Sequence, residues 1–349
     1  MSTNTYNKCI SNQFIKMKPL GFLFFFLGCL SLAACERGPS LTQSCEIPMQ
    51  DQVPNIATPE AIEIFELAKA YDSDIYRTNQ LPEPGPPVLE KYQHIESDRV
   101  KARELYEQAA KLGHVISMNR LAMFQAEGLG LTGDYDIPDF KASFYWFKES
   151  ARRGDSYGFN ALADFFLYGL GRKQDPAMGE KCLIQAAKRG MMEAQIRLAE
   201  LDLGLLSGYE RAPVNPPHRI ERGLQLLEDA GFKGYTNAYR QLKNYYYYEE
   251  DIPIRAEYYA RFGSIIGNER TQSALESGYR NNLFTPENQH LHTCVNDLKP
   301  EDFPRLEELC PRVGGPLTRE RVGLPPAPTE PLDVEEYLDD FERKYGEPK

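Results

Sequence analysis

Residues and motifs suited to catalysis are scarce in this sequence. Only five histidines occur among its 349 residues. The chain has no Gly-x-Ser-x-Gly nucleophile elbow, no Walker phosphate loop, no His-Glu-x-x-His zinc helix and no duplicated His-x-Lys motif of the phospholipase D type. Carboxylate pairs are frequent, but the exposed helices of an acidic protein supply such pairs without any catalytic role. The sequence therefore predicts a protein that is not an enzyme, with neither catalytic residues nor a cofactor.

Positive charge is also in short supply. Lysine and arginine number 40 against 51 acidic residues, which gives a formal net charge of −11. Because like charges repel, this balance argues against nucleic acids and anionic membrane surfaces as binding partners. It favours a basic protein partner, although simple solubility explains an acidic surface equally well.

Candidate zinc ligands occur close together near the C-terminal part of the chain. His290, His292 and Cys294 form a His-x-His-x-Cys string of suitable ligand types. A closed zinc site needs further ligands, and no second cluster of matching spacing exists in the sequence. No metal site is therefore predicted.

An apolar run, Leu20–Ala34, follows two lysines near the N-terminus. It is shorter than the roughly 20 residues that span a membrane and suits the apolar core of a secretory signal. Its last residues, with Cys35, read Leu-Ala-Ala-Cys and resemble a bacterial lipobox, which implies removal of residues 1–34 and lipidation of Cys35. Met17 is an alternative start of the chain. A plain signal peptide or an uncleaved anchor is the alternative interpretation of the run.

The lipobox resemblance also implies a location. Glu36 follows Cys35, whereas retention of such lipoproteins in the inner membrane is usually associated with Asp at this place. We therefore expect a periplasm-facing lipoprotein, in the outer membrane rather than the inner, whose only membrane contact is the lipid.

The middle of the chain contains a five-fold repeat. Each unit has a glycine that serves as its origin: Gly113, Gly154, Gly190, Gly234 and Gly267. A small residue stands four positions before every origin: Ala109, Ser150, Ala186, Ala230 and Gly263. A leucine stands eight positions after every origin: Leu121, Leu162, Leu198, Leu242 and Leu275. The origins are 41, 36, 44 and 33 residues apart, within the range of stacked helical-pair repeats.

These spacings indicate helix faces. Positions three, four, seven and eight residues apart lie on one side of a helix, so the small residues and the leucine form the buried stripes of two successive helices. The origin glycine suits a helix C-terminus, where a left-handed residue closes the last turn. Asp98, Asp139 and Asp175 stand where the second helix of their units would begin and are of the type that caps helix N-termini.

Two segments carry a resemblance to a known family. "FNALADFFLYGLGRKQDPAMGEKCLIQAAKRG" and "MNRLAMFQAEGLG", the latter followed by "DFKASFYWFKESARRG", share an order of small residue, leucine, Gly-x-Gly turn, capping Asp, aromatic residue and small pair before glycine. This order resembles the Sel-1-like repeats, relatives of the tetratricopeptide repeat, strongly over about 100–234 and more weakly over 235–278. The resemblance implies an all-α fold, a right-handed α-solenoid of helix pairs with a concave face, and it implies no activity.

The extent of the repeats divides the rest of the chain into segments. We expect a lipidated tether at 35–57, the solenoid at 58–278 and a Pro-rich, partly irregular tail at 279–349. The tail is expected to wrap around the last repeats and to end in an acidic helix at Pro331–Tyr345. A disordered tail is the alternative.

Four cysteines follow Cys35, and cysteines pair in an oxidising compartment. Cys294 and Cys310, sixteen residues apart in a stretch punctuated by proline, are expected to form a disulfide. Cys182 falls on a core position of the repeat, which indicates a small buried side chain. Cys45 has no obvious partner.

In solenoids of this kind the first helix of each pair tends to line the concave face. Its non-core positions are expected five, six and ten residues after each origin. The predicted partner-binding residues are Met118, Asn119, Phe159, Asn160, Asp164, Ile196, Glu200, Tyr239 and Arg240. A stripe of apolar and aromatic side chains is unusual on a surface that only water contacts. The alternative is that neighbouring units or the tail cover it.

Two functions fit these features. Acidic bacterial lipoproteins with Sel-1-like repeats are similar to the immunity proteins that neutralise phospholipase D effectors of type VI secretion systems in the periplasm. That similarity implies a basic effector toxin as the partner, blocked without chemistry, and it is an argument from association. The alternative is an envelope scaffold that assembles several cell-envelope proteins.

Overall fold

The structure is a computed structural model that describes residue 45 and residues 54–72, 88–130, 137–206, 216–266, 269–281, 283–284 and 286–345. The predicted signal peptide, the lipidation site Cys35 and most of the predicted tether lie outside these residues. Every regular element in the described part of the chain is helical. None of the described helices combines the length and apolar character that a membrane crossing requires.

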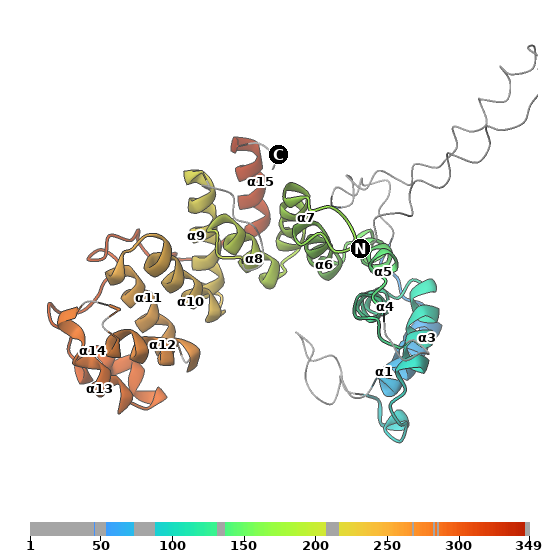
Figure 1. Cartoon of the computed structure of the whole chain (residues 1–349), viewed down its shortest axis with the longest axis horizontal. Coiled ribbons are helices and arrows are strands. Elements are labelled where there is room, and N and C mark those ends of the chain that lie inside the picture. Colours follow the sequence, from blue (N-terminus) through green and yellow to red (C-terminus); the bar gives the residue numbers. More distant parts are fainter. Residues whose placement is uncertain are drawn as a thin grey trace, which may run out of the picture. The chain divides into compact units, whose positions relative to one another are not determined.

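The helices form consecutive pairs along the chain (Figure 1). The first helices of the pairs are α1 (Pro59–Tyr71), α4 (Val115–Glu127), α6 (Ser156–Leu167), α8 (Met192–Asp202) and α10 (Asn237–Asn244). The second helices are α3 (Arg99–Lys111), α5 (Phe140–Ala151), α7 (Pro176–Lys188), α9 (Pro217–Phe232) and α11 (Pro253–Ile265), and α12 (Glu269–Arg280) follows. Each second helix also packs against the first helix of the next pair. The all-α solenoid of helix pairs predicted from the sequence is confirmed.

The repeated leucines and small residues form the interfaces between these helices. The exposed fraction is 0% for all five leucines: Leu121, Leu162, Leu198, Leu242 and Leu275. Small residues allow the backbones to approach closely, since a Cβ atom on Gly179 of α7 would lie 2.6 Å from Leu167 Cγ of α6. That distance is far shorter than a carbon–carbon contact, so a larger residue would force the two helices apart.

The helix ends also follow the sequence pattern. Four origin glycines are left-handed, with φ of 92° at Gly113, 78° at Gly154, 80° at Gly190 and 92° at Gly234. The three aspartates cap the second helices, because Asp98, Asp139 and Asp175 accept the backbone N–H of Lys101, Ala142 and Met178 at 3.0, 2.9 and 3.1 Å. Both features fix where each pair turns.

A run of four tyrosines, Tyr245–Tyr248, interrupts the regular pattern after α10. A π-helix, η4 (Tyr245–Glu249), replaces the last turns of this first helix. The ring of Tyr246 stacks on Tyr259 of α11, with centroids 5.6 Å apart, whereas Tyr248 is 67% exposed. The run therefore divides between the core and the surface.

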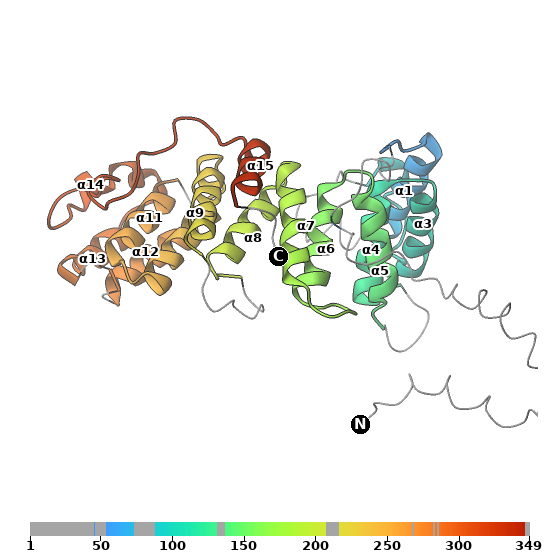
Figure 2. The same cartoon turned by 90° about the horizontal axis from the view of Figure 1, so that it is seen from above.

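The tail is ordered over residues 286–345. After η5 (Pro286–Asn288) it forms α13 (Leu291–Asn296), η6 (Pro300–Arg305), α14 (Leu306–Leu309) and the acidic helix α15 (Val334–Tyr345). In Figure 2 it runs from α14 past α11 and α9 to α15, beside α7. It thus passes the second helices of the last three pairs in reverse order.

Ion pairs attach the tail to two of these helices. Arg312 Nε and Nη2 donate to the buried Glu257 of α11 at 2.8 and 3.2 Å. Arg319 Nη1 donates to Glu228 of α9 at 2.7 Å. The side chains of the tail thereby become part of the packing of the last repeats.

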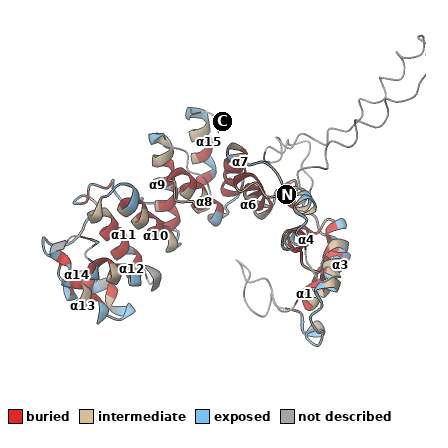
Figure 3. Ribbon diagram, viewed as in Figure 1, coloured by how far each residue is buried: buried red, intermediate tan, exposed pale blue. Residues whose placement is uncertain are grey.

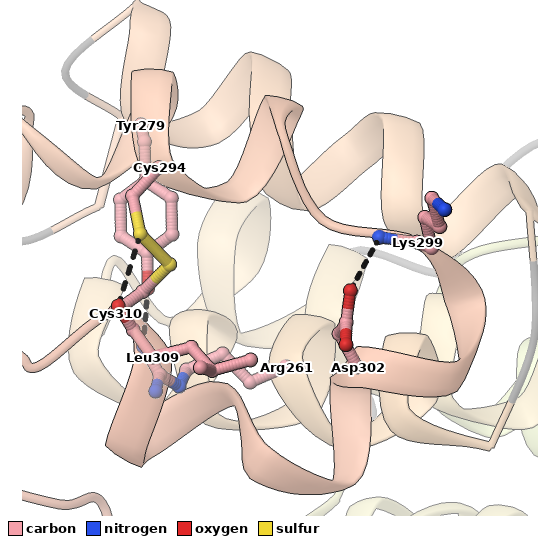
Figure 4. Close-up of a disulfide and its surroundings, with 7 residues drawn as sticks. All are labelled: Arg261, Tyr279, Cys294, Lys299, Asp302, Leu309 and Cys310. Carbon is pink, nitrogen blue, oxygen red and sulfur yellow. Dashed lines mark hydrogen bonds between the residues drawn. A yellow bond between two sulfur atoms is a disulfide. The ribbon is translucent and has the colours of Figure 1, made fainter.

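A disulfide closes the start of the tail. Cys294 on α13 is bonded to Cys310 after α14, the pair expected from the sequence (Figure 4). Close to it, Arg261 Nη1 donates to Tyr279 Oη at 2.8 Å. Because its thiol is used in the disulfide, Cys294 is not available as a zinc ligand.

Cys182 is buried, as its repeat position indicates, and the structure supplies the pairing that the sequence left open. Cys182 on α7 forms a disulfide with Cys45, 137 residues earlier in the chain, and both residues are almost completely buried. The repeat pattern indicated burial correctly but could not supply a partner that lies outside the repeats. Residue 45 of the predicted tether is therefore held in the core.

Candidate partner-binding surface

On four first helices, α4, α6, α8 and α10, one stripe is open to solvent. Its residues stand three, ten and fourteen positions after the origin, on one face of the helix. This first-helix stripe comprises Ile116, Met123 and Glu127 on α4, Tyr157 and Asp164 on α6 with Tyr168 after it, Glu193 and Glu200 on α8, and Asn237 and Asn244 on α10 with Tyr248 in η4. All of them are exposed or half-buried. Figure 3 shows such partly exposed faces beside the buried faces through which the helices pack.

The apolar part of the predicted binding site is not on this stripe. Met118, Phe159, Ile196 and Tyr239 are 1%, 1%, 9% and 7% exposed. The Arg189 guanidinium lies 4.4 Å from the centre of the Phe159 ring, and Tyr239 lies against Gly231 and Phe262. The prediction that these four side chains contact a partner is wrong, because neighbouring helices cover them.

The two predicted asparagines connect repeats and are also buried. Asn119 Nδ2 of α4 donates to Asp155 at the start of α6, at 2.9 Å. Asn160 Oδ1 of α6 accepts from Arg197 Nη1 of α8 at 2.7 Å. Their hydrogen bonds align successive first helices, so these side chains are committed to stacking and not to a partner.

The three remaining predicted residues, Asp164, Glu200 and Arg240, are half-buried and accessible. Asp164 and Glu200 make the same kind of contact in successive repeats. In each case the side chain ten positions after one origin contacts the side chain seven positions after the next origin. Asp164 is ion-paired with Arg197, and Glu200 accepts from Gln241. Asp164 and Glu200 belong to the first-helix stripe, and Arg240 lies beside it.

The two carboxylates are incompletely compensated. Burial raises the pKa of Asp164, and the Arg197 guanidinium opposes this only in part. Burial also raises the pKa of Glu200, where the attraction of Arg240 is the largest opposing effect and Glu193 adds repulsion. A half-buried carboxylate in this condition gains from one more cation, so this part of the stripe fits a basic side chain of a partner.

The C-terminal end of the stripe is aromatic and basic. The exposed Tyr248 ring lies 6.0 Å from Lys243 Nζ on α10. Burial and the neighbouring Arg240 lower the pKa of Lys243. Exposed tyrosine beside partly desolvated charge is typical of strong contacts at protein interfaces. The tyrosine run was visible in the sequence, but the π-helix that turns Tyr248 outward was not.

The described residues also include the side-chain types that metal ions require as ligands. Among the described side chains, no group of three or more His, Cys, Asp or Glu residues is arranged to hold a metal ion. In the His-x-His-x-Cys string, His292 Nε2 accepts from Arg280 Nε at 3.0 Å.

Comparisons with known proteins match the repeats. The Sel1 repeat model matches residues 92–114, 115–155 and 160–191. A chitin synthase regulator of Saccharomyces cerevisiae is 31% identical over 130 residues, which are 35% of this chain but only 18% of the length of that protein.

Two solved structures of other proteins are similar to this chain. A Sel1 repeat protein from Oxalobacter formigenes has 19% identity and a TM-score of 0.48, over 69% of this chain and 89% of its own. An immunity protein from Pseudomonas aeruginosa has 19% identity and a TM-score of 0.40, over 73% of this chain and 90% of its own. The chain contains Sel1 repeats, the helical-pair modules through which Sel1 proteins contact other proteins.

Proposed function

We propose that this protein is a non-catalytic, periplasm-facing lipoprotein that binds a toxic effector protein through the first-helix stripe and neutralises it. One observation carries the proposal. The stripe is open on α4, α6, α8 and α10, whereas in the repeats that carry it the chain's own tail contacts the second helices α7, α9 and α11. The tail helix α13 packs against α12, beyond the stripe. The stripe is therefore a surface that the tail leaves open to a partner.

Charge supports a basic partner. The whole chain carries −11, and Glu127, Asp164, Glu193 and Glu200 lie on the stripe. Complementary charge accelerates encounter and discriminates against acidic proteins. A basic effector of the phospholipase D type, delivered by a type VI secretion system, fits this requirement, and blocking its active-site entrance requires no chemistry from the inhibitor.

The disulfides support an exported protein. All four cysteines among the described residues are paired, as Cys45–Cys182 and Cys294–Cys310. Disulfides of this kind persist in oxidising compartments such as the bacterial periplasm. Together with the lipobox-like sequence they support lipidation at Cys35 and attachment to the outer membrane.

Capture of the partner tests the proposal. The full chain, isolated from envelope fractions of its source organism, is expected to retain one dominant basic protein whose lipase activity is lost on binding. Several weakly bound envelope proteins, without protection against any toxin, would instead favour the scaffold function.

A matched pair of tyrosines locates the binding surface. Tyr248→Ala on the stripe is expected to weaken partner binding about tenfold or more, because exposed tyrosines often dominate interfaces. Tyr145→Ala on the second helix α5 is the control, since Tyr145 is 54% and Tyr248 67% exposed. Equal affinities of the two variants would place the partner elsewhere on the molecule.

A further inference from the structure

The acidic helix α15 bridges two consecutive repeats. At the end of α7, Lys188 Nζ lies 2.7 Å from Asp339 Oδ1 and 2.6 Å from Glu342 Oε2 of α15. Leu338, on the inner side of α15, is completely buried. The helix is therefore attached to α7 by two ion pairs, and it buries one apolar side chain.

The other attachment is to α9. The Arg222 guanidinium lies 4.4 Å from the centre of the Phe341 ring, and His218 stacks on Tyr345 with centroids 4.4 Å apart. Just before α15, Leu332 N donates to Asp229 Oδ1 at 2.7 Å, and Leu332 O accepts from Lys233 Nζ at 3.1 Å. One helix thus holds α7 and α9 together.

The attachment is separable from the repeats. Residues 325–331, which lead to α15 and include four prolines, are all exposed. Lys188 is ion-paired with carboxylates of α15, whereas Arg222 contacts the Phe341 ring and Lys233 donates to the backbone carbonyl of Leu332. Arg222 and Lys233 also pair with Asp202 and Asp229 of the repeats, so detachment of α15 leaves these two cations with carboxylate partners.

Two side chains that hold α15 and its leading residues also hold α8. Asp229 Oδ2 accepts from Gln195 Nε2 of α8 at 2.9 Å, while its other oxygen accepts from Leu332. Arg222 Nε donates to Asp202 Oδ2 at the end of α8, at 2.6 Å. Asp229 is 3% and Arg222 1% exposed. Hydrogen bonds buried away from water are strong, and those of one network depend on one another. A change at α15 therefore reaches α8 through contiguous contacts.

We propose that α15 is a reversible strap. When it is bound to α7 and α9, it fixes the position of α8, which carries Glu193 and Glu200 of the first-helix stripe. When it is released, α8 gains freedom and the stripe loses its preformed geometry, and a preformed surface binds more tightly than a mobile one. The effect on partner affinity rests on the proposed function, whereas the effect on α8 does not.

Hydrogen–deuterium exchange of the full chain tests the strap without any partner. The double variant Asp339→Asn, Glu342→Gln removes both negative charges that Lys188 contacts. We expect its α15 amides to exchange about tenfold faster, together with faster exchange in α8. The control is Glu336→Gln, Asp340→Asn, which changes the net charge equally at exposed positions of the same helix, where Asp340 pairs with Arg343 of α15 itself.

A second variant separates release of the strap from loss of charge. Leu332→Pro removes the N–H that donates to Asp229 and alters no charge, and it is expected to accelerate exchange in α8 as well. Faster exchange of α15 with unchanged α8 in both variants would overturn the coupling. Unchanged exchange in α15 would overturn the strap. Faster exchange throughout, α4 included, would show that α15 belongs to the cooperative core and is not reversible.

Discussion

The repeats before and after α8 are held together in different ways. From α4 to α8 the side-chain links join neighbouring repeats, as in Asn119–Asp155 and Arg197–Asn160, whose members are 36 and 37 residues apart. In the later repeats the tail adds links such as Arg312–Glu257 and Arg319–Glu228, 55 and 91 residues apart. In the early part most side-chain links join neighbouring repeats, as in a solenoid, with the Cys45–Cys182 bond and the contact of α15 with α7 added to them. The later part depends more on distant segments, as a globular domain does.

This difference teaches where sequence period is informative. A contact between neighbouring repeats recurs with the period and can be found by counting from the origins. A contact with the tail occurs once and leaves no periodic trace. The later repeats accordingly depend on residues that no repeat pattern would identify.

Removing the two disulfides in turn probes both regions and has the largest expected effect. The Cys45–Cys182 bond closes a loop over a separation of 137 residues around the early repeats, and the Cys294–Cys310 bond closes one over 16 residues in the tail. The chain-entropy model gives losses of about 5 and about 3 kcal/mol for the paired alanine variants. Guanidinium unfolding monitored by circular dichroism measures both. Equal losses of stability would contradict the expectation that the longer loop, around the early repeats, contributes more to stability.

The substitution Glu257→Ala is expected to destabilise the later region alone. It leaves the buried Arg312 without its carboxylate and Tyr279 without an acceptor 2.7 Å away, which costs about 3–5 kcal/mol. Exchange of amides in α11 and α12 is expected to accelerate, while α4 and α6 remain protected. In the control, Glu104→Ala, only an exposed pair with Lys101 is lost, and stability should change by less than about 0.5 kcal/mol. Equal loss of protection in α4 would mean that the two regions unfold as one.

A pH titration affects the early region and has the smallest expected effect. His114 caps α4, where its Nδ1 accepts from Ser117 N at 3.2 Å, and burial lowers its pKa to about 4 from 6.5. The unfolded chain binds this proton more readily than the folded one. The contribution of neutral His114 to stability is therefore fully present above pH 6.5 and is lost as the pH falls towards 4. Urea unfolding at pH 5 should give about 2 kcal/mol less stability than at pH 7. His114→Asn keeps a capping side chain without the titration, and this variant should lose that part of the pH dependence.

Sequence pattern predicted the frame of the fold well. The leucines, the capping aspartates and the origin glycines lie where the period placed them, because each is fixed by local helix geometry. The depth of burial around a first helix was misjudged at Phe159 and Tyr239. A first helix has its own partner on one side and neighbouring repeats on others, so only a narrow stripe stays open. Phe159→Asp is therefore expected to unfold the repeat and cannot serve as a test of binding.

Other features were beyond the reach of the sequence because they join segments with no common register. The partner of Cys182, the attachment of Arg312 to Glu257 and the shared role of Asp229 are of this kind. Tyr248 was visible as a member of a tyrosine run, but only the π-helix distinguishes it from the buried Tyr245 and Tyr246.

The Cys45–Cys182 bond makes the early part of the protein a closed covalent ring. The ring contains α1, α3, α4, α5, α6 and the first half of α7. A protease that cuts the backbone once anywhere inside it leaves the molecule in a single piece, with the N-terminal segment still attached to the repeats. A nicked protein of this kind separates into fragments only after reduction. The bond therefore preserves the connection between the N-terminal segment and the repeats after a single proteolytic cut.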